Sequence, residues 1–176
     1  MPQEIAKKHS LWLNSPNLQP VVNELAKETG NPIFVPHLTL IGNYVGTGSE
    51  TMMLVQNIAS RFKAQLTIDF AGFGTKDEEF RYFCLLAKPN SELDRLYEYV
   101  HQAFKLATQE TFRQWPHISL LYGTQSARET YPDIEELAAR YEDSLDGPLS
   151  FTKITALDTS GDVATWSTIG AVTLSA

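Results

Sequence analysis

Two histidines, His37 and His117, each stand two positions before a hydroxyl residue, Thr39 or Ser119. Both pairs lie in a five-residue segment that begins with proline and is otherwise apolar, Pro-His-Leu-Thr-Leu and Pro-His-Ile-Ser-Leu. Side chains alternate across a β-strand, so residues two positions apart point to the same face. We therefore expect each segment to form a strand with its histidine and its hydroxyl on one face.

Together the two pairs have the composition of an acid-base site for a phosphate ester. Imidazole titrates near neutral pH, so one neutral histidine can take a proton from water while a protonated one donates to the departing oxygen. Hydroxyl groups can donate to the non-bridging phosphate oxygens, whose charge increases in the transition state. If the fold brings the pairs together, His37 and His117 are the expected acid and base, and Thr39 and Ser119 the expected phosphate-binding groups.

The repetition of the motif is the main support for this hypothesis, because a single histidine in such a strand usually has only a structural role. The copies share the proline, the histidine, the hydroxyl at the same offset and the apolar surroundings. Their histidines, at positions 37 and 117, are 80 residues apart, which is too far for a solenoid repeat and suits a duplicated half. We expect one domain over residues 1–176, made of two lobes that each contribute one motif, with the site between them.

Hydrophobic periodicity predicts the elements that position the motifs. Alternating or continuous apolar residues predict strands at about 9–13, 33–43, 66–70, 80–87, 115–123, 149–157 and 163–169. Apolar residues at helical spacing predict helices at about 18–30, 49–62, 92–105 and 133–141. Each motif strand is thus flanked by helices.

The composition narrows the kinds of protein and of ligand that need to be considered. The chain is 43% hydrophobic and 20% charged, as in ordinary soluble globular proteins. The net charge of −7 argues against sequence-independent binding of long nucleic acids, which needs a basic surface, but allows a small anionic ligand in a local pocket. No apolar stretch approaches the roughly 20 residues of a membrane span, and the first eight residues lack the apolar stretch of a secretory signal. We expect a cytoplasmic protein with no membrane partner.

The single cysteine, Cys84, excludes an intrachain disulfide and a cysteine metal site. A small buried residue in a strand is its expected role. Two histidines with no acidic residue at ligand spacing also make a poor metal site, so we expect no metal and no cofactor.

These motifs resemble those of the 2H phosphoesterases, most closely their cyclic phosphodiesterase branch of the plant and yeast kind. The similarity runs from His-Ser-Leu-Trp-Leu at 9–13, through Phe-Val-Pro-His-Leu-Thr-Leu at 34–40, to Pro-His-Ile-Ser-Leu-Leu-Tyr at 116–122. It implies an α+β, bilobal fold in which two antiparallel sheets face each other across a cleft, with helices outside and a pseudo-two-fold axis. It also implies that both histidines are catalytic and that no metal is required.

The activity implied by this resemblance is hydrolysis of a ribose cyclic phosphate to a phosphomonoester. ADP-ribose 1″,2″-cyclic phosphate and nucleoside 2′,3′-cyclic phosphates are the expected small-molecule substrates. One alternative is action on RNA ends or 2′,5′ linkages, as in other members of the superfamily, including those resembling RNA ligases. Another is a module that binds a phosphorylated ligand without turnover, although such a module would be expected to lack one histidine.

Further residues are weaker candidates for contact with the substrate. Tyr122 resembles a tyrosine near the family's site, although strict alternation puts it on the face opposite His117. Trp115 shares the face of His117 and is a candidate for stacking on a base or ribose. Arg81 could bind a second phosphate, but the sequence favours a plain surface arginine. Trp166, in the last expected strand, is a candidate like Trp115, with core or rim packing as the alternative.

Overall fold

The computed structural model describes residues 4–105, 111–143, 145 and 147–174. Its strands are β1 (Lys7–Asn14), β2 (His37–Gly46), β3 (Leu66–Ile68), β4 (Phe70–Gly74), β5 (Phe83–Ala87), β6 (His117–Leu121), β7 (Leu149–Phe151), β8 (Lys153–Asp158) and β9 (Ser167–Thr173). Its helices are α1 (Gln19–Thr29), α2 (Gly48–Arg61), α3 (Ser91–Phe104), α4 (Thr111–Gln114), α5 (Gln125–Thr130) and α6 (Glu135–Tyr141). Short 3₁₀ turns occur at Pro16–Leu18, Glu79–Arg81 and Val163–Thr165.

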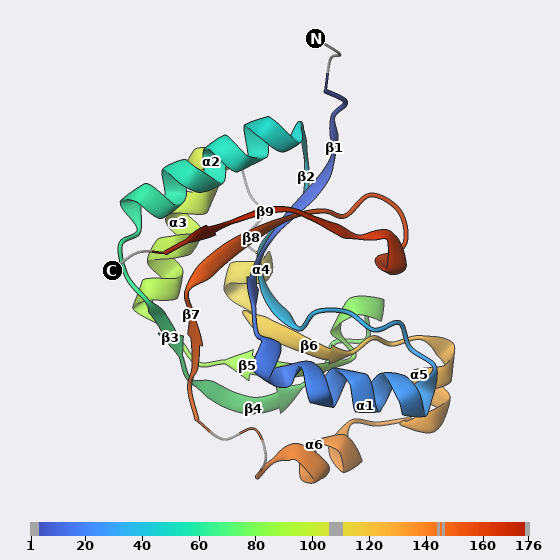
Figure 1. The fold of residues 1–176 in the computed structure, drawn as a ribbon. Coiled ribbons are helices and arrows are strands. Elements are labelled where there is room, and N and C mark those ends of the chain that lie inside the picture. The colour runs from blue at the N-terminus through green and yellow to red at the C-terminus, as the bar shows by residue number, and fades with distance from the viewer. Residues whose placement is uncertain (1–3, 106–110, 144, 146, 175–176) are drawn as a thin grey trace.

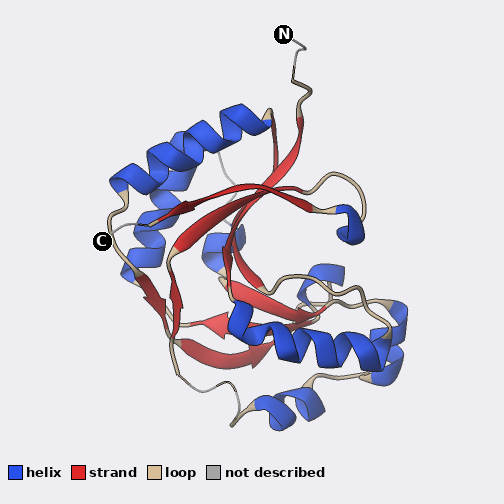
Figure 2. Ribbon diagram, viewed as in Figure 1, coloured by secondary structure: helices blue, strands red, loops and turns tan. Residues whose placement is uncertain are grey.

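Seven of these strands form one antiparallel sheet in the order β4-β5-β6-β2-β1-β8-β9, and β3 pairs with β7 in a second, two-stranded sheet (Figure 1). Helices surround the strands on the outside (Figure 2). The expected α+β architecture with antiparallel sheets is confirmed. The two expected large sheets are the two halves of one sheet, joined where β2 meets β6.

The motif strands β2 and β6 are neighbours in the middle of the large sheet. Their ladder consists of one residue pair, Leu38 with Ile118, whereas each strand pairs more extensively with its outer neighbour, β1 or β5. This narrow junction puts two segments that are far apart in sequence beside each other. It is the structural basis of a shared site.

The two halves follow the same local order of strand, helix and motif strand, β1-α1-β2 and β5-α3-β6. Each connecting helix packs on the other half: α1 lies against β6 and α5, and α3 lies against α2 and β2 (Figure 1). Because the helices cross over in this way, the halves are held together on the side opposite the motif side chains.

The apolar members of the motif strands lie in the core, as the alternation predicts. Four of them are at most 1% exposed: Leu38, Leu40, Ile118 and Leu120. Burying side chains of this size stabilises the fold by roughly 2 kcal/mol each. A shift of either strand by one residue would move its histidine into this core, so core packing fixes the direction of the motif side chains.

Local signals account for the ends of the longer helices. The Thr47 hydroxyl accepts a hydrogen bond from the Glu50 amide at the start of α2, and the Asn90 side chain accepts from Leu93 at the start of α3. Gly30, with φ of 67°, ends α1 in the left-handed conformation that glycine adopts most readily.

The structure corrects several expected boundaries. The strand expected at 33–43 is β2, which begins only at His37, and the strand expected at 80–87 begins with the 3₁₀ turn Glu79–Arg81. The strand expected at 163–169 likewise begins with a 3₁₀ turn, and β9 follows it. Helix α5 has no counterpart among the expectations, because six residues with one buried apolar member, Ala127, show no periodicity.

Within the described ranges, no helix combines the length and the apolar character that crossing a bilayer would require.

Candidate active site

The four motif side chains line a single cavity of about 260 Å³. His37 and Thr39 come from β2, and His117 and Ser119 come from β6. Both pairs therefore reach the same space across the narrow junction of the two half-sheets. The sequence-based expectation that the four side chains converge agrees with this placement.

Both imidazoles are held through the same ring nitrogen. Nδ1 of His37 lies 2.6 Å from the carbonyl oxygen of Val35, and Nδ1 of His117 lies 2.8 Å from that of Trp115. A carbonyl oxygen only accepts hydrogen bonds, so each neutral ring must carry its proton on Nδ1. Nε2 of each ring is then the nitrogen that can accept a proton from water or, once protonated, donate it.

Burial keeps both imidazoles uncharged in the free protein. The histidine side chains are only 7–8% exposed. Loss of hydration lowers the pKa of His37 to about 3 and that of His117 to about 4, and the nearby cations Arg81 and Lys76 also lower the pKa of His117. At neutral pH both rings can act as bases, and the acidic form requires an anion in the cavity.

Acidification should therefore destabilise the fold. Between about pH 6.5 and 4 the unfolded chain binds more protons at these two histidines than the folded chain, so the free energy of unfolding falls as pH falls through this range. From pH 7 to pH 5 we expect a loss of roughly 1 to 2 kcal/mol for each histidine, measured by urea unfolding.

A double variant, His37→Gln with His117→Gln, should lose most of this pH dependence, and the control His101→Gln on α3 should retain it. An unchanged dependence in the double variant would assign the titration to other groups.

The two hydroxyls differ in their surroundings. Ser119 Oγ donates to the carbonyl oxygen of Phe80 at 2.6 Å and lies 3.6 Å from Sγ of Cys84, its cross-strand neighbour on β5. Thr39 lies opposite Trp12 on β1, and its hydroxyl makes no hydrogen bond to any part of the chain that the structure describes. Thr39 can donate to a bound phosphate at once, whereas Ser119 must first leave Phe80.

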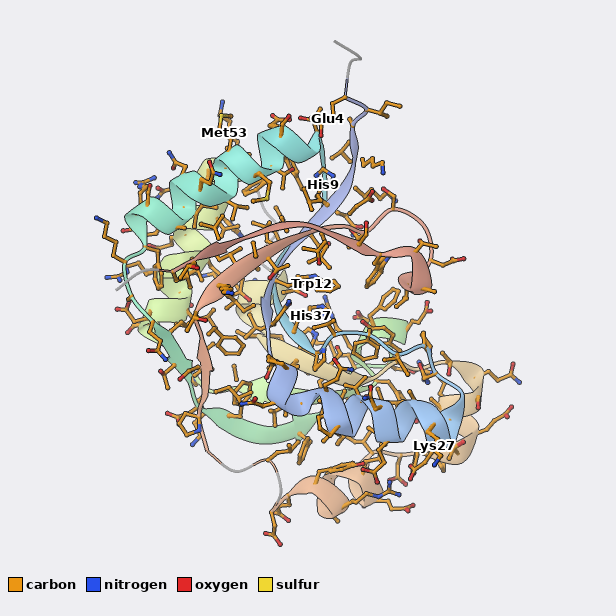
Figure 3. The ribbon with its side chains drawn as sticks, in the orientation of Figure 1. Glu4, His9, Trp12, Lys27, His37 and Met53 are labelled. Atoms are coloured by element: carbon orange, nitrogen blue, oxygen red, sulfur yellow. The ribbon has the colours of Figure 1, made fainter. Side chains whose placement is uncertain are left out.

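Trp12 forms one wall of the cavity, a role that the sequence did not assign to it. Its ring stacks on that of His37 with centroids 3.4 Å apart and planes 6° from parallel, and the two side chains lie together in Figure 3. It also meets Trp166 edge-on, with centroids 5.7 Å apart. The stack shields His37 from water and so contributes to its low pKa.

The family model described as "Cyclic phosphodiesterase-like protein" matches residues 6–174. The chain belongs to this cyclic phosphodiesterase-like family. The cyclic phosphodiesterase of Arabidopsis thaliana is 29% identical over 158 residues, which cover 85% of this chain and 83% of that protein. The expected membership of the 2H phosphoesterase superfamily is confirmed, and the protein is an enzyme, a 2H-type phosphodiesterase.

Solved structures share the fold of this cyclic phosphodiesterase-like protein at low identity. E. coli LigT in complex with 3′-AMP aligns with a TM-score of 0.62 and 14% identity, covering 97% of this chain and 99% of LigT. Kluyveromyces marxianus Usb1 aligns with a TM-score of 0.58 and 12% identity, covering 99% of both chains. The protein therefore has the fold of these two structures, in keeping with the α+β architecture that the resemblance implied.

In this cyclic phosphodiesterase-like protein Tyr122 lines the cavity although strict alternation predicted the opposite face. Strand β6 ends at Leu121, so the alternation does not extend to position 122. The Tyr122 ring stacks on Phe34, with centroids 3.9 Å apart, and meets Phe80 edge-on. This aromatic group holds the tyrosine at the cavity wall.

Trp115, expected to contact the substrate, is not among the described residues that line the cavity. It precedes β6, and its ring lies 4.6 Å from that of His117 and under the ammonium group of Lys76. The part of Trp115 that serves the site is its carbonyl group, which fixes His117.

Two residues with weaker sequence support, Arg81 and Trp166, do line the cavity. Cys84 is fully buried in β5, in keeping with its expected role. Among the described residues, no three histidine, cysteine, aspartate or glutamate side chains gather as a metal site would require.

Proposed function

We propose that this phosphodiesterase hydrolyses the cyclic phosphate of a small nucleotide to a phosphomonoester by two-histidine acid-base catalysis, without a metal. Nucleoside 2′,3′-cyclic phosphates and ADP-ribose 1″,2″-cyclic phosphate are the proposed substrates. The observation that carries the proposal is the pair of buried imidazoles, each with Nδ1 bound to a backbone carbonyl, in one cavity with two hydroxyls.

In the proposed reaction, Nε2 of one neutral histidine takes a proton from water as the water oxygen attacks phosphorus. The bond from phosphorus to one ribose oxygen breaks, and Nε2 of the other, protonated histidine donates its proton to that oxygen. Thr39 and Ser119 donate to the non-bridging oxygens, where negative charge increases. The histidines exchange protonation states in each turnover, and proton exchange with solvent restores them.

Bound phosphate provides the negative charge that one imidazole needs in order to be protonated inside the cavity. Burial alone keeps both imidazoles neutral, but an anion between the rings favours the charged form of one of them. The acid therefore forms when the substrate binds, and it forms beside the oxygen that needs the proton. This coupling predicts a bell-shaped dependence of kcat on pH.

A small substrate is favoured over a long polynucleotide. The cavity of about 260 Å³ is small and partly lined by aromatic side chains, and the chain carries a net charge of −7, which disfavours a polyanion. The similar protein from Arabidopsis thaliana is a cyclic phosphodiesterase, and LigT binds 3′-AMP, which is a ribose phosphomonoester. Both observations support a cyclic phosphate as substrate and a monoester as product.

The test is incubation, with EDTA present, with a panel of 2′,3′-cyclic nucleotides and ADP-ribose 1″,2″-cyclic phosphate, followed by phosphorus NMR. We expect each productive reaction to give one phosphomonoester, because in the proposed step one histidine protonates one ribose oxygen. The double variant His37→Ala with His117→Ala is the background control.

RNA with a 2′,3′-cyclic end and RNA with a 2′,5′ linkage complete the panel. Turnover of these polymers without turnover of the small molecules would assign the enzyme to RNA ends instead. Binding of the cyclic nucleotides with no product at all would indicate a binding module.

A further inference from the structure

The cavity needs a source of positive charge for an anionic ligand. The chain is acidic overall, and burial leaves both cavity histidines neutral at pH 7. Among the described residues that line the cavity, Arg81 is the one that carries a permanent positive charge. The position of the Arg81 side chain is therefore important for the binding of an anion such as phosphate in this cavity.

Arg81 is not the plain surface residue that the sequence favoured. Its side chain is only 14% exposed, although it lies in the 3₁₀ turn Glu79–Arg81 between two strands. The guanidinium group pairs with the carboxylate of Glu78 at 3.3 Å, and the Glu78 side chain is 56% exposed. Both residues line the cavity, where the Arg81 cation is largely covered and its carboxylate partner stays in contact with water.

The turn that carries Arg81 is fixed to the catalytic strand and the segment after it. The Ser119 hydroxyl donates to the Phe80 carbonyl at 2.6 Å, and the Gly123 amide donates to the Glu79 carbonyl at 2.6 Å. The Lys76 amide also donates to the carbonyl oxygen of Arg81 at 2.8 Å. In the free protein these bonds set the position of the turn that carries Arg81 relative to Ser119.

We propose that Arg81 binds the non-bridging oxygens of the phosphate at the proposed catalytic site, and that Glu78 holds the guanidinium group in the free enzyme. The proposal rests on the proposed function for the identity of the ligand. A guanidinium group matches two phosphate oxygens with parallel N–H donors, which makes charge-assisted hydrogen bonds at a defined angle.

Replacement of the Glu78 carboxylate by phosphate as the partner of Arg81 requires little free energy. The Glu78 carboxylate is largely in water, and ion pairs with an exposed partner contribute little to stability. Phosphate inside the cavity is less hydrated, so its interaction with the cation is stronger than that of the exposed carboxylate. Glu78 therefore competes weakly with the ligand and keeps the empty cavity electrically balanced.

The test measures the Kd of inorganic phosphate by isothermal titration calorimetry for the wild type and three variants. Arg81→Gln should weaken binding by about 10- to 100-fold, since charged hydrogen bonds are lost. Arg81→Lys should restore part of this loss, because lysine keeps the charge but not the paired donors. Glu78→Gln should tighten binding by roughly twofold to tenfold, because the competing carboxylate is removed.

Matched controls come from α3, where Glu92 and Arg95 form an ion pair with the same three-residue spacing, at 2.6 Å. Arg95→Gln and Glu92→Gln make the same charge changes on another element and should leave the phosphate Kd unchanged. The gain expected for Glu78→Gln is a result that misfolding cannot produce.

The proposal is overturned if Arg81→Gln binds phosphate as the wild type does, if Glu78→Gln weakens binding, or if the α3 variants change the Kd to the same extent. Its failure is distinguishable from failure of the proposed function. An enzyme that hydrolyses cyclic phosphates with no effect of Arg81→Gln rejects only the role of Arg81. An enzyme that binds phosphate through Arg81 but hydrolyses no cyclic phosphate rejects only the reaction.

Discussion

Replacing His117 or His37 with alanine should lower kcat by about two to four orders of magnitude, the scale usual for general acid-base groups. Each imidazole has its Nδ1 proton bound to a carbonyl oxygen, so its Nε2 atom is the one left to exchange a proton with the substrate or water. The loss should appear mainly in kcat, because the proton transfers to and from the rings take place in the transition state.

The measurement is steady-state kinetics with a nucleoside 2′,3′-cyclic phosphate, with His101→Ala on α3 as a control that removes an imidazole elsewhere. The double variant should be about as slow as the slower single variant, because both histidines act in one step. Rates near wild type in either single variant would reject the two-histidine mechanism. Independent, multiplicative losses would show that the rings act in separate steps.

The face on which the motif side chains lie could be predicted from sequence, because strand alternation and core burial both indicate the same face. In β2 the apolar residues Leu38 and Leu40 are buried, and the polar residues that alternate with them, His37 and Thr39, must face the other way. The same holds in β6. The identity of these faces depends on local pattern alone, which a single sequence contains.

The contribution of Trp12, by contrast, depends on strand pairing. Trp12 reaches the site because β1 pairs with β2 in a register that sets it opposite Thr39. Within its own segment it is one apolar residue among several, and nothing in the local pattern distinguishes a cavity wall from the core. Only the pairing partner makes that distinction.

Alternation fails where the strand is no longer paired, which explains the outcome for Tyr122 and Trp115. Both flank β6, one just past its end and one before its start, and each adopts a direction set by its own neighbours. Arg81 is a related case, because its position depends on a 3₁₀ turn that has no periodic signal. Residues at strand ends are therefore where sequence reasoning about this site was least informative.

The two halves of the site have their strands and helix in the same order, but different residues pair with the two hydroxyl residues across the sheet. Thr39 lies opposite Trp12, and Ser119 lies opposite Cys84. A tryptophan offers Thr39 no acceptor here, whereas the turn beyond Cys84 brings the Phe80 carbonyl to Ser119. Despite the approximate symmetry of the fold, the Thr39 hydroxyl can donate directly to a bound phosphate, whereas the Ser119 hydroxyl already donates to Phe80.

Thr39→Val should consequently lower kcat by about two to three orders of magnitude, the loss typical of removing one donor to transition-state charge. Ser119→Ala should cost less, because the Ser119 hydroxyl gives up its bond to Phe80 before it donates to phosphate, and the net gain is smaller. Thr39→Ser, which keeps the hydroxyl, is the matched control and should retain most of the activity. Comparing kcat for the three variants checks the asymmetry directly. A larger loss in Ser119→Ala than in Thr39→Val would mean that the bond to Phe80 holds Ser119 in its catalytic position rather than withholding it.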